Sequence, residues 1–264
     1  MRILHALAPA PFGGLERVVQ DLAQAQAQAG HEVSVAAIGQ AEAEVAPFLD
    51  RLRVGEVRPH PILVPPRGYL AERRAVAALS RSTGAEVLHT HGYRPDVVDG
   101  GAAGKVGIPA VTSVHGFTGG GWRNRLYEWL QCRAYRRFQA VVAVSNPLRK
   151  TLLAHGVPGH LLHVVRNALA EPPFLSRQAA RERLGAPEGV FQIGWVGRLS
   201  REKGPDLFLD ALARMPPADG VRVTFMGTGP LKEALEAAAR DRGLSDRVRF
   251  PGSVEGAATL LPRI

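Results

Sequence analysis

The segment GWVGRLSREKGPD, Gly194 to Asp206, contains the pattern that decides the fold of this chain of 264 residues. It connects an apolar run, Val190 to Val196, with a helical pattern, Pro205 to Arg214, that begins on a proline. A buried strand, a loop with glycine and a helix form the repeating unit of parallel sheets that helices cover on both faces. Because the same alternation continues on either side of this segment, the sequence predicts an α/β fold.

Strand-like and helix-like stretches alternate through the rest of the chain. Besides Val190 to Val196, the predicted strands are Arg2 to Leu7, Glu32 to Ile38, Pro61 to Val64, Glu86 to His89, Ala110 to Val114, Ala140 to Val144, Leu162 to Val165, Val221 to Met226 and Val248 to Phe250. Two prolines interrupt the alternation within Asn167 to Phe174, which indicates a hinge. We therefore predict a first domain at residues 1–170, a linker at 171–187 and the first half of a second domain at 188–264.

The composition limits the classes of partner. A formal net charge of +9 and a pI of about 10.5 favour an anionic partner. Nucleic acid is not expected, because no helix-turn-helix, RNP-like or zinc-finger pattern is present and aromatic residues make up only 6%. A diphosphate substrate or an anionic membrane surface explains the charge instead. The single cysteine, Cys132, excludes an internal disulfide framework and fits a buried apolar position.

The apolar runs and one basic stretch indicate how the chain would interact with a membrane. Runs such as Ala140 to Val144 are too short to cross a bilayer, so we expect a cytoplasmic protein. From Gly121 to Lys150 seven lysines and arginines accompany one acid, Glu128, and aromatic residues are interleaved with them. Two interpretations of residues 122–138 stay open. The stretch is either an interfacial helix on the anionic inner face of the membrane, or a helix with its aromatics in the core and its arginines in solvent.

A glycine pair lies between the first predicted strand and the first predicted helix. Gly13 and Gly14, followed by Glu16, allow close approach of a ligand to the backbone, and a helix N-terminus behind them favours a phosphate. A tight connection without a ligand is the alternative.

A histidine follows the predicted strand Ala110 to Val114. In doubly wound sheets, ligands bind at the carboxyl ends of strands, which is where His115, Gly116 and Phe117 lie. Such a histidine can accept a proton, donate to an oxyanion or orient a sugar hydroxyl. A loop histidine that caps the following turn is the alternative for this segment.

Two cations flank the loop of the opening segment. The strand ends in Gly197 and Arg198, and Lys203 precedes the helix that begins at Pro205, so two positive charges and a helix N-terminus converge. This arrangement suits a diphosphate, since arginine binds phosphate oxygens in pairs and lysine supplies a compact charge. No Asp-x-Asp pair occurs in the chain, so we expect no metal ion and assign its role to Arg198 and Lys203.

The ordered set of motifs resembles the retaining glycosyltransferases of family 4, which have the GT-B fold. The matching segments are Gly13-Gly14-x-Glu16, Thr90-His91-Gly92, Pro109 to Phe117, Val144-Ser145, Arg166-Asn167, Val196 to Lys203 with Gly204, Gly227 to Pro230, and Phe250 to Gly252. This resemblance implies two Rossmann-like doubly wound parallel sheets that face each other across a cleft, the first on the acceptor side and the second, incomplete here, for the nucleotide-sugar. It also implies sugar transfer with retention from a nucleotide-diphospho-sugar to a glycan or lipid-linked acceptor of envelope or exopolysaccharide synthesis, with no metal and no further cofactor.

The resemblance assigns roles residue by residue. Arg198 and Lys203 would hold the donor diphosphate, and His115 would lie beside the anomeric carbon, so these three are the expected catalytic residues. Gly116 and Phe117 would lie on the acceptor side. The expected donor-binding residues are Gly13, Gly14, Glu16, Gly197, Gly227, Gly229 and Gly252.

The resemblance is incomplete at one point. The family's pair of glutamates separated by seven residues would follow Ile264, so we expect a C-terminally truncated member whose full activity belongs to a longer parent chain. Two other functions stay open. One is a non-catalytic module that binds a nucleotide diphosphate or a partner, and the other is an epimerase of the same architecture.

Overall fold

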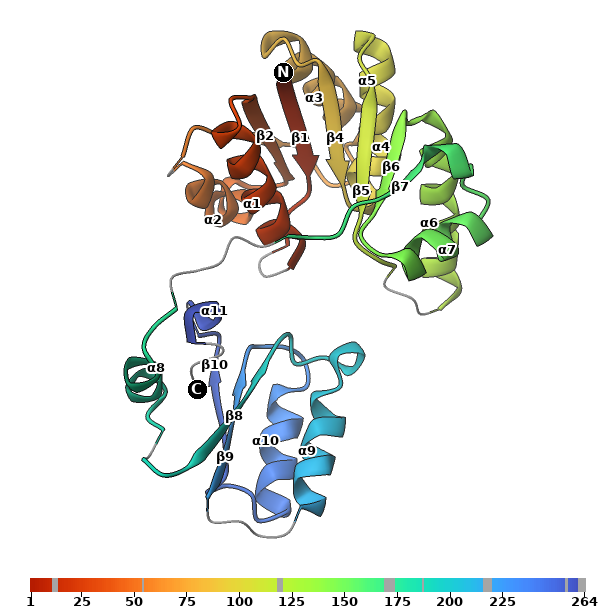
Figure 1. Ribbon diagram of the computed structural model, residues 1–264. Helices are drawn as coiled ribbons and strands as arrows, with labels where there is room; N and C mark the ends of the chain where they lie inside the picture. The colour runs from red at the N-terminus through yellow and green to blue at the C-terminus, as the bar shows by residue number, and fades with distance from the viewer. Residues whose placement is uncertain are drawn as a thin grey trace. The chain divides into compact units, whose positions relative to one another are not determined.

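The computed structural model describes residues 1–10, 14–53, 55–117, 121–168, 174–186, 188–215, 220–254 and 256–260. The chain forms two compact units, residues 1–170 and 171–264 (Figure 1). Each unit contains parallel strands connected by helices, as the predicted α/β class requires.

The first unit contains a sheet of seven parallel strands in the order β3-β2-β1-β4-β5-β6-β7. The elements are β1 (Arg2–Leu7), α1 (Gly14–Gln28), β2 (Glu32–Gly39), α2 (Glu42–Leu52), β3 (Arg58–Leu63), α3 (Tyr69–Ser82), β4 (Val87–His91), α4 (Tyr93–Val98), α5 (Gly100–Val106), β5 (Ala110–Val114), α6 (Trp122–Ala134), the 3₁₀ turn η1 (Tyr135–Arg137), β6 (Ala140–Ala143), α7 (Asn146–Ala154), η2 (Gly159–Leu161) and β7 (Leu162–Val164). The order reverses between β1 and β4, which is the point where doubly wound sheets bind their ligands.

Both faces of this sheet are buried. Along β2, Val33, Val35 and Ala37 belong to a core shared with α1 and α2, whereas Ala36 and Ile38 belong to a core shared with α3 and α5. Successive side chains of a strand point to opposite faces, so an uninterrupted apolar run is required here. This explains why the strands were recognisable as apolar runs in the sequence.

The edge strand β3 begins three residues earlier than the sequence predicted, at Arg58 instead of Pro61. Pro59 and Pro61 lie within it, and prolines cannot donate to a neighbouring strand. They are accommodated because β3 pairs on one side only, with β2, among the described strands.

Asp96 on α4 connects four elements of the first unit. Its Oδ1 accepts hydrogen bonds from Thr90 Oγ1 (2.6 Å) and Thr112 Oγ1 (2.7 Å), and its Oδ2 accepts from Gln131 Nε2 (2.8 Å) and Tyr135 OH (3.1 Å). Burial raises the pKa of this carboxyl to about 6, and the four hydrogen bonds oppose the rise. The network ties α4, α6 and η1 to the ends of β4 and β5.

The second unit contains three parallel strands in the order β10-β9-β8. Its elements are α8 (Arg177–Leu184), β8 (Phe191–Val196), the 3₁₀ turn η3 (Arg201–Lys203), α9 (Pro205–Arg214), β9 (Val221–Met226), α10 (Lys232–Asp241), β10 (Val248–Gly252) and α11 (Ala257–Leu260). The ring of Phe225 is fully buried between the rings of Trp195, Phe208 and Phe250, with centroids 4.9–5.6 Å away. These aromatic contacts form the centre of its core.

The segment expected as a linker differs from the prediction. Within residues 171–187, α8 forms a helix whose Ser176 Oγ accepts a hydrogen bond from Ala179 N (3.2 Å). Ala180 is fully buried and packs with Met226 and Leu260 of the second unit. The helix was missed because it is rich in arginine and carries only this one buried apolar residue.

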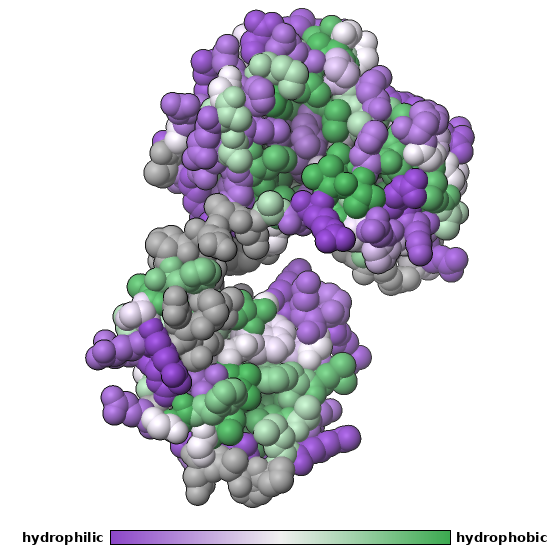
Figure 2. Space-filling view, in the orientation of Figure 1, coloured by the Kyte–Doolittle hydropathy of each residue, from purple (hydrophilic) through white to green (hydrophobic). Residues whose placement is uncertain are grey.

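The strand β8 has one strand partner, β9, among the described residues. Phe191 and Val196 on β8 are 68% and 46% exposed, and Figure 2 shows hydrophobic residues on this face of the second unit. The strand therefore presents apolar side chains and one row of backbone groups that no described strand pairs.

Asp96 leads to a prediction on stability and pH. The folded state holds its proton more tightly than the unfolded chain, so this carboxyl stabilises the fold fully below pH about 4 and the contribution is lost as pH rises through about 6. Relative to Asp96→Asn, the wild-type free energy of unfolding should fall by roughly 2.5 kcal/mol between pH 4 and pH 7.5, since a tenfold change in proton affinity corresponds to about 1.36 kcal/mol. Urea unfolding of both proteins measures this, and an unchanged difference between them would contradict the assignment.

Candidate active site

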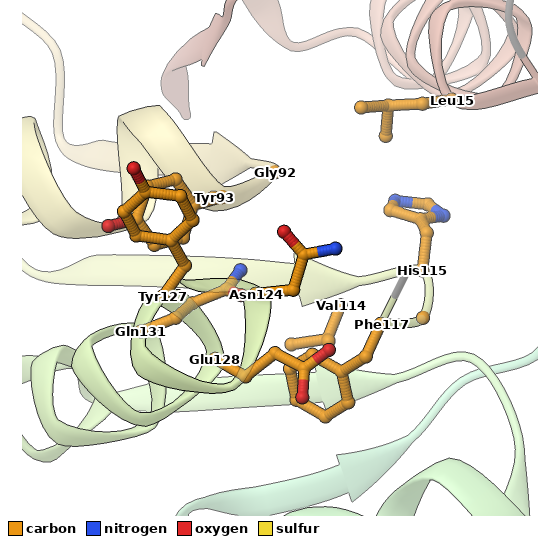
Figure 3. Close-up of a pocket in the computed structure, with 11 residues that line it drawn as sticks. Leu15, Gly92, Tyr93, Val114, His115, Phe117, Asn124, Tyr127, Glu128 and Gln131 are labelled. Atoms are coloured by element: carbon orange, nitrogen blue, oxygen red, sulfur yellow. The ribbon is translucent and has the colours of Figure 1, made fainter. Parts of the chain in front are cut away.

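A pocket of ≈ 370 Å³ opens at the carboxyl ends of β4 and β5 in the first unit. Figure 3 shows His115 beneath Leu15 on one side and the rings of Tyr93 and Tyr127 on the other. The lining residues are Leu15, Gly92, Tyr93, Val114, His115, Gly116, Phe117, Asn124, Tyr127, Glu128 and Gln131. The pocket therefore lies beside the point where the strand order reverses, as expected for a doubly wound sheet.

The three residues predicted after β5 all reach this pocket. His115 is half-buried, Gly116 is exposed, and Phe117 packs on the core below with its ring 5.7 Å from the ring of His155. Burial lowers the pKa of His115, so at neutral pH the imidazole is uncharged. A neutral imidazole can donate one hydrogen bond and accept another, which suits recognition of a sugar hydroxyl.

The opposite wall of the pocket comes from α4 and α6, and sequence reasoning did not identify it. Tyr93 and Tyr127 contact each other with ring centroids 5.2 Å apart, and Gln131 is held by its hydrogen bond to Asp96. Asn124, Tyr127, Glu128 and Gln131 recur at helical spacing on one face of α6, which was the available signal. The same helix was interpreted only for its cations and aromatics.

The predicted glycine loop is described only at its helical end. Gly13 lies outside the described residues, whereas Gly14 begins α1 and Leu15 reaches the pocket. Glu16 accepts a hydrogen bond from Ala10 N at its Oε1 (2.7 Å), so it connects the start of the loop after β1 to the first turn of α1. Glu16 is thereby placed as a residue that shapes this connection.

In the second unit, Arg198 and Lys203 are both exposed around η3, directly before α9. Glu202 lies between them: a hydrogen bond from Ser200 Oγ (2.5 Å) lowers the pKa of its carboxyl, and the charges of Arg198 and Lys203 lower it further. Both cations therefore lie near one carboxylate at the N-terminus of a helix. This carboxylate was not part of the predicted site, and it reduces the positive charge there.

Two of the glycines predicted to bind the donor, Gly227 and Gly229, are required by the packing of the backbone. A Cβ on Gly227 would overlap the carbonyl oxygen of Gly197, and one on Gly229 would overlap that of Leu199; both glycines have positive φ. Leu199 N donates to Thr228 O (2.9 Å) and Gly227 N donates to Gly252 O (2.7 Å). The turn after β9 is thus hydrogen-bonded to the loop that carries Arg198 and packs closely against it.

Comparison with known proteins identifies the family. Residues 12–170 match the family described as Glycosyltransferase Family 4, and residues 176–261 match Glycosyl transferases group 1. The chain belongs to glycosyltransferase family 4. The predicted family and the GT-B type of α/β fold are thus confirmed for this family 4 chain.

Named relatives match different shares of the family 4 chain. The lipopolysaccharide core biosynthesis mannosyltransferase LpsB of Rhizobium meliloti is 33% identical over 44% of the chain, and D-inositol 3-phosphate glycosyltransferase 1 of Catenulispora acidiphila is 28% identical over 90%. These alignments cover 34% and 63% of the two relatives' own lengths. Among solved structures, HepE of Anabaena in complex with UDP and glucose matches with a TM-score of 0.80 at 22% identity, over 98% of this chain and 71% of that one.

The glycine turn of the family 4 chain leads to a prediction. Gly229→Ala and Gly227→Ala should each destabilise the second unit by about 3 kcal/mol or more, because steric overlap and backbone strain add. Gly220→Ala is the matched control in the same unit, since its Cβ would meet nothing within 4 Å. Hydrogen exchange of peptides from residues 188–254, with those of the first unit as reference, measures the effect. Equal protection in all three variants would refute the packing argument.

Proposed function

We propose that this chain contributes the donor diphosphate site and the acceptor pocket of a retaining glycosyltransferase, which transfers a sugar from a nucleotide-diphospho-sugar to a glycan or lipid-linked acceptor. The observation that carries the proposal is that Arg198 and Lys203 are both exposed just before α9, where the charges of both act on Glu202. HepE, which is related in fold, is described in complex with UDP and with UDP-glucose, and this supports a nucleotide-sugar donor.

In the proposed reaction, the bond between the anomeric carbon and the donor diphosphate breaks, and a hydroxyl oxygen of the acceptor forms the new bond to that carbon. The proton of this hydroxyl passes to the departing nucleoside diphosphate, on which negative charge develops. Arg198 would bind two oxygens of the diphosphate, and Lys203 would add a point charge. The backbone N–H groups at the start of α9 would contribute in the same direction. Stabilisation of the developing charge lowers the barrier more than it tightens donor binding.

The proposed site needs no metal ion. An Asp-x-Asp pair commonly holds a metal-diphosphate complex, and the sequence contains no such pair. In the proposal, Arg198 and Lys203 take the role of the metal ion. No cofactor other than the donor is part of the proposal.

In the first unit, we assign the pocket of ≈ 370 Å³ to the sugar and the acceptor. Its aromatic wall, Tyr93 and Tyr127, offers a surface for sugar rings, and the neutral His115 offers a hydrogen bond beside it. The placement of His115 next to the anomeric carbon follows from the resemblance to the family. LpsB, a lipopolysaccharide core enzyme, supports an envelope glycan as the acceptor class.

The proposal extends to binding at the inner face of a membrane. No helix in the described part of the chain combines the length and the apolar character of a membrane span. The exposed face of α6 carries Leu126 (46%) and Trp129 (54%) beside Arg125, and the Arg133 guanidinium lies 5.8 Å from the Trp129 ring centroid. Of the two interpretations of this helix, the exposed aromatics favour an interfacial one, which would bring the pocket next to a lipid-linked acceptor.

The cation pair is tested by calorimetry with UDP, GDP and ADP. Arg198→Ala and Lys203→Ala should each weaken binding of the preferred nucleotide roughly 10- to 100-fold, as expected for loss of a charge-assisted hydrogen bond. Arg201→Ala, an exposed cation on the same turn, should change the affinity less than about threefold. Equal losses in all three variants would show a diffuse charge effect and contradict the assignment.

Transfer itself is measured with labelled nucleotide-sugars, on this chain and on any longer product of the same gene. A labelled glycan or lipid with a retained anomeric configuration supports the proposed function. Tight nucleotide binding without turnover of any donor would favour a binding module instead. An altered sugar in the absence of acceptor would favour an epimerase.

Membrane binding is tested by sedimentation with vesicles. The wild-type chain should bind vesicles with anionic lipid several-fold better than neutral ones, and high salt should weaken this binding. The double variant Leu126→Ser, Trp129→Ser should lose most of it, whereas Leu70→Ser, an exposed apolar residue on α3, should not. Identical binding by both variants would place the interfacial surface elsewhere.

A further inference from the structure

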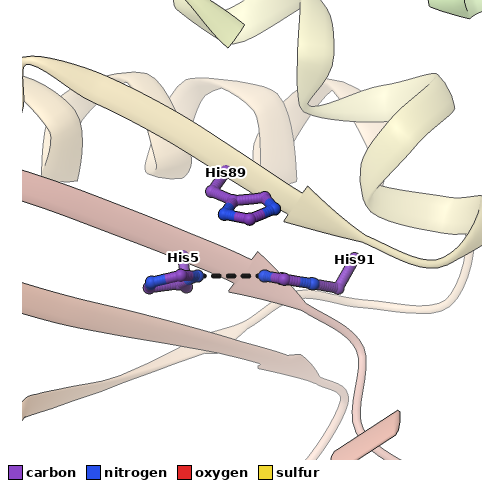
Figure 4. Close-up of side chains that lie close together, drawn as sticks. All are labelled: His5, His89 and His91. Carbon is purple, nitrogen blue, oxygen red and sulfur yellow. Dashed lines mark hydrogen bonds between the residues drawn. The ribbon is translucent and has the colours of Figure 1, made fainter. Parts of the chain in front are cut away.

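Three buried histidines lie side by side in the sheet of the first unit, next to the pocket. His5 on β1 and His89 and His91 on β4 are 0%, 9% and 1% exposed. Figure 4 shows His5 and His91 joined end to end, with the His89 ring stacked on that of His91 and tilted against that of His5. Burial lowers the pKa of His5 to about 4 and those of His89 and His91 well below the usual value, so all three rings are neutral.

The hydrogen bonds of this cluster determine which nitrogens carry protons. His5 Nε2 lies 2.7 Å from Gln26 Oε1, which can only accept, so His5 Nε2 carries a hydrogen. His5 Nδ1 is then the acceptor for His91 Nε2–H, at 2.9 Å. A neutral ring has one N–H, and therefore Nδ1 of His91 carries a lone pair.

This lone pair has a partner within reach. His91 Nδ1 and His115 Nε2 are both buried and have no hydrogen-bond partner among the described residues. The centroids of the two rings are 6.1 Å apart, which is 0.9 Å more than the 5.2 Å between the hydrogen-bonded rings of His5 and His91. His115 is only half-buried, so its ring has room to move by this amount.

A metal site is the other chemistry that three neighbouring histidines suggest. Candidate ligand atoms of His5, His89 and His91 lie within 4.8 Å of one another. Both nitrogens of His5 are already used in hydrogen bonds, and His89 Nε2 lies 2.9 Å from Ser113 Oγ. The stacked rings of His89 and His91, with centroids 4.2 Å apart, do not direct their lone pairs at a common point. Hydrogen bonding therefore explains the cluster better than metal binding.

We propose that His91 is a positioning residue of the pocket, which accepts a hydrogen bond from His115 Nε2–H and forms with His5 and Gln26 one directional chain into the sheet. The chain runs from His115 Nε2–H to His91 Nδ1, from His91 Nε2–H to His5 Nδ1, and from His5 Nε2–H to Gln26 Oε1. His115 then presents the lone pair of its Nδ1, and this nitrogen accepts a hydrogen bond from a hydroxyl of the bound sugar. The inference rests on the proposed function only for the identity of that ligand.

The tautomers are measured on the substrate-free protein, so the result does not depend on enzymatic activity. Protein labelled with ¹⁵N-histidine is studied by NMR at neutral pH, where ring nitrogens with and without hydrogen have different chemical shifts. His5, His91 and His115 should each be a single Nε2–H tautomer. A His115 that carries its hydrogen on Nδ1, or that exchanges between the two forms like a solvent-exposed histidine, overturns the proposal.

Variants separate positioning from a structural role. His91→Phe keeps a ring in place but removes the acceptor, so the single tautomer of His115 should be lost. His91→Asn keeps a polar atom near the position of Nδ1 and should retain it, and His163→Gln, an exposed residue on β7, should leave it unchanged. A His115 signal that is the same in His91→Phe and wild type overturns the proposal.

The same samples also cover two other cases, a variant that does not fold and a bound metal ion. If His91→Phe does not fold, as its amide spectrum would show, the wild-type tautomers decide alone. Metal analysis of the wild-type protein should find less than stoichiometric zinc, copper or nickel. One equivalent of metal that is absent from His89→Phe would replace the hydrogen-bonded chain with a metal site.

Discussion

The first unit depends on the hydrogen bonds that converge on Asp96. A carboxylate without solvent is costly to bury, and four donors from β4, β5, α6 and η1 offset that cost. The pKa of about 6 shows that burial still outweighs them. The aromatic wall of the pocket lies on α4 and α6. The hydrogen bond from Gln131 on α6 to Asp96 on α4 holds these two helices together and so helps to position the wall. A single buried polar centre thus links the packing of the unit with the geometry of the site.

In the second unit, the candidate site is positioned by a different constraint, the close approach of two backbone segments. Gly227 and Gly229 allow the turn after β9 to lie against the carbonyl groups of Gly197 and Leu199. Arg198 lies between these two residues, so its backbone is held while its side chain stays exposed. A mobile side chain on a fixed backbone suits the role proposed for Arg198, which would stay bound to the diphosphate both before and after the bond to the sugar breaks.

The two units also differ in electrostatics. The pocket of the first unit adjoins four histidines whose pKa values all lie below the usual value because of burial, so their rings are uncharged, and its lining includes one carboxylate side chain, Glu128. The candidate site of the second unit has two exposed cations at a helix N-terminus, with Glu202 between them. A nucleotide-diphospho-sugar has the matching division, a neutral sugar and an anionic diphosphate. The proposed function assigns the anionic diphosphate to the cations of the second unit.

The sequence by itself determined the α/β class, the positions of the strands and the residues at their carboxyl ends. Buried parallel strands must be continuous apolar runs, and the residues that follow them, such as His115 and Arg198, lie at the ligand-binding edge whatever the details of packing. The sequence did not predict the charged helix α8 or the correct start of the edge strand β3, which contains two prolines, because both lack a continuous apolar pattern.

Only the tertiary structure decided which distant side chains meet. His5 and His91 are 86 residues apart in sequence, and Asp96 and Tyr135 are 39 apart, yet each pair is joined by a hydrogen bond. The register of β1 against β4 places His5 beside His89 and His91, and the docking of α6 places Gln131 on Asp96. Such contacts depend on strand order and helix packing, which involve the whole unit and leave no mark in a local pattern of residues.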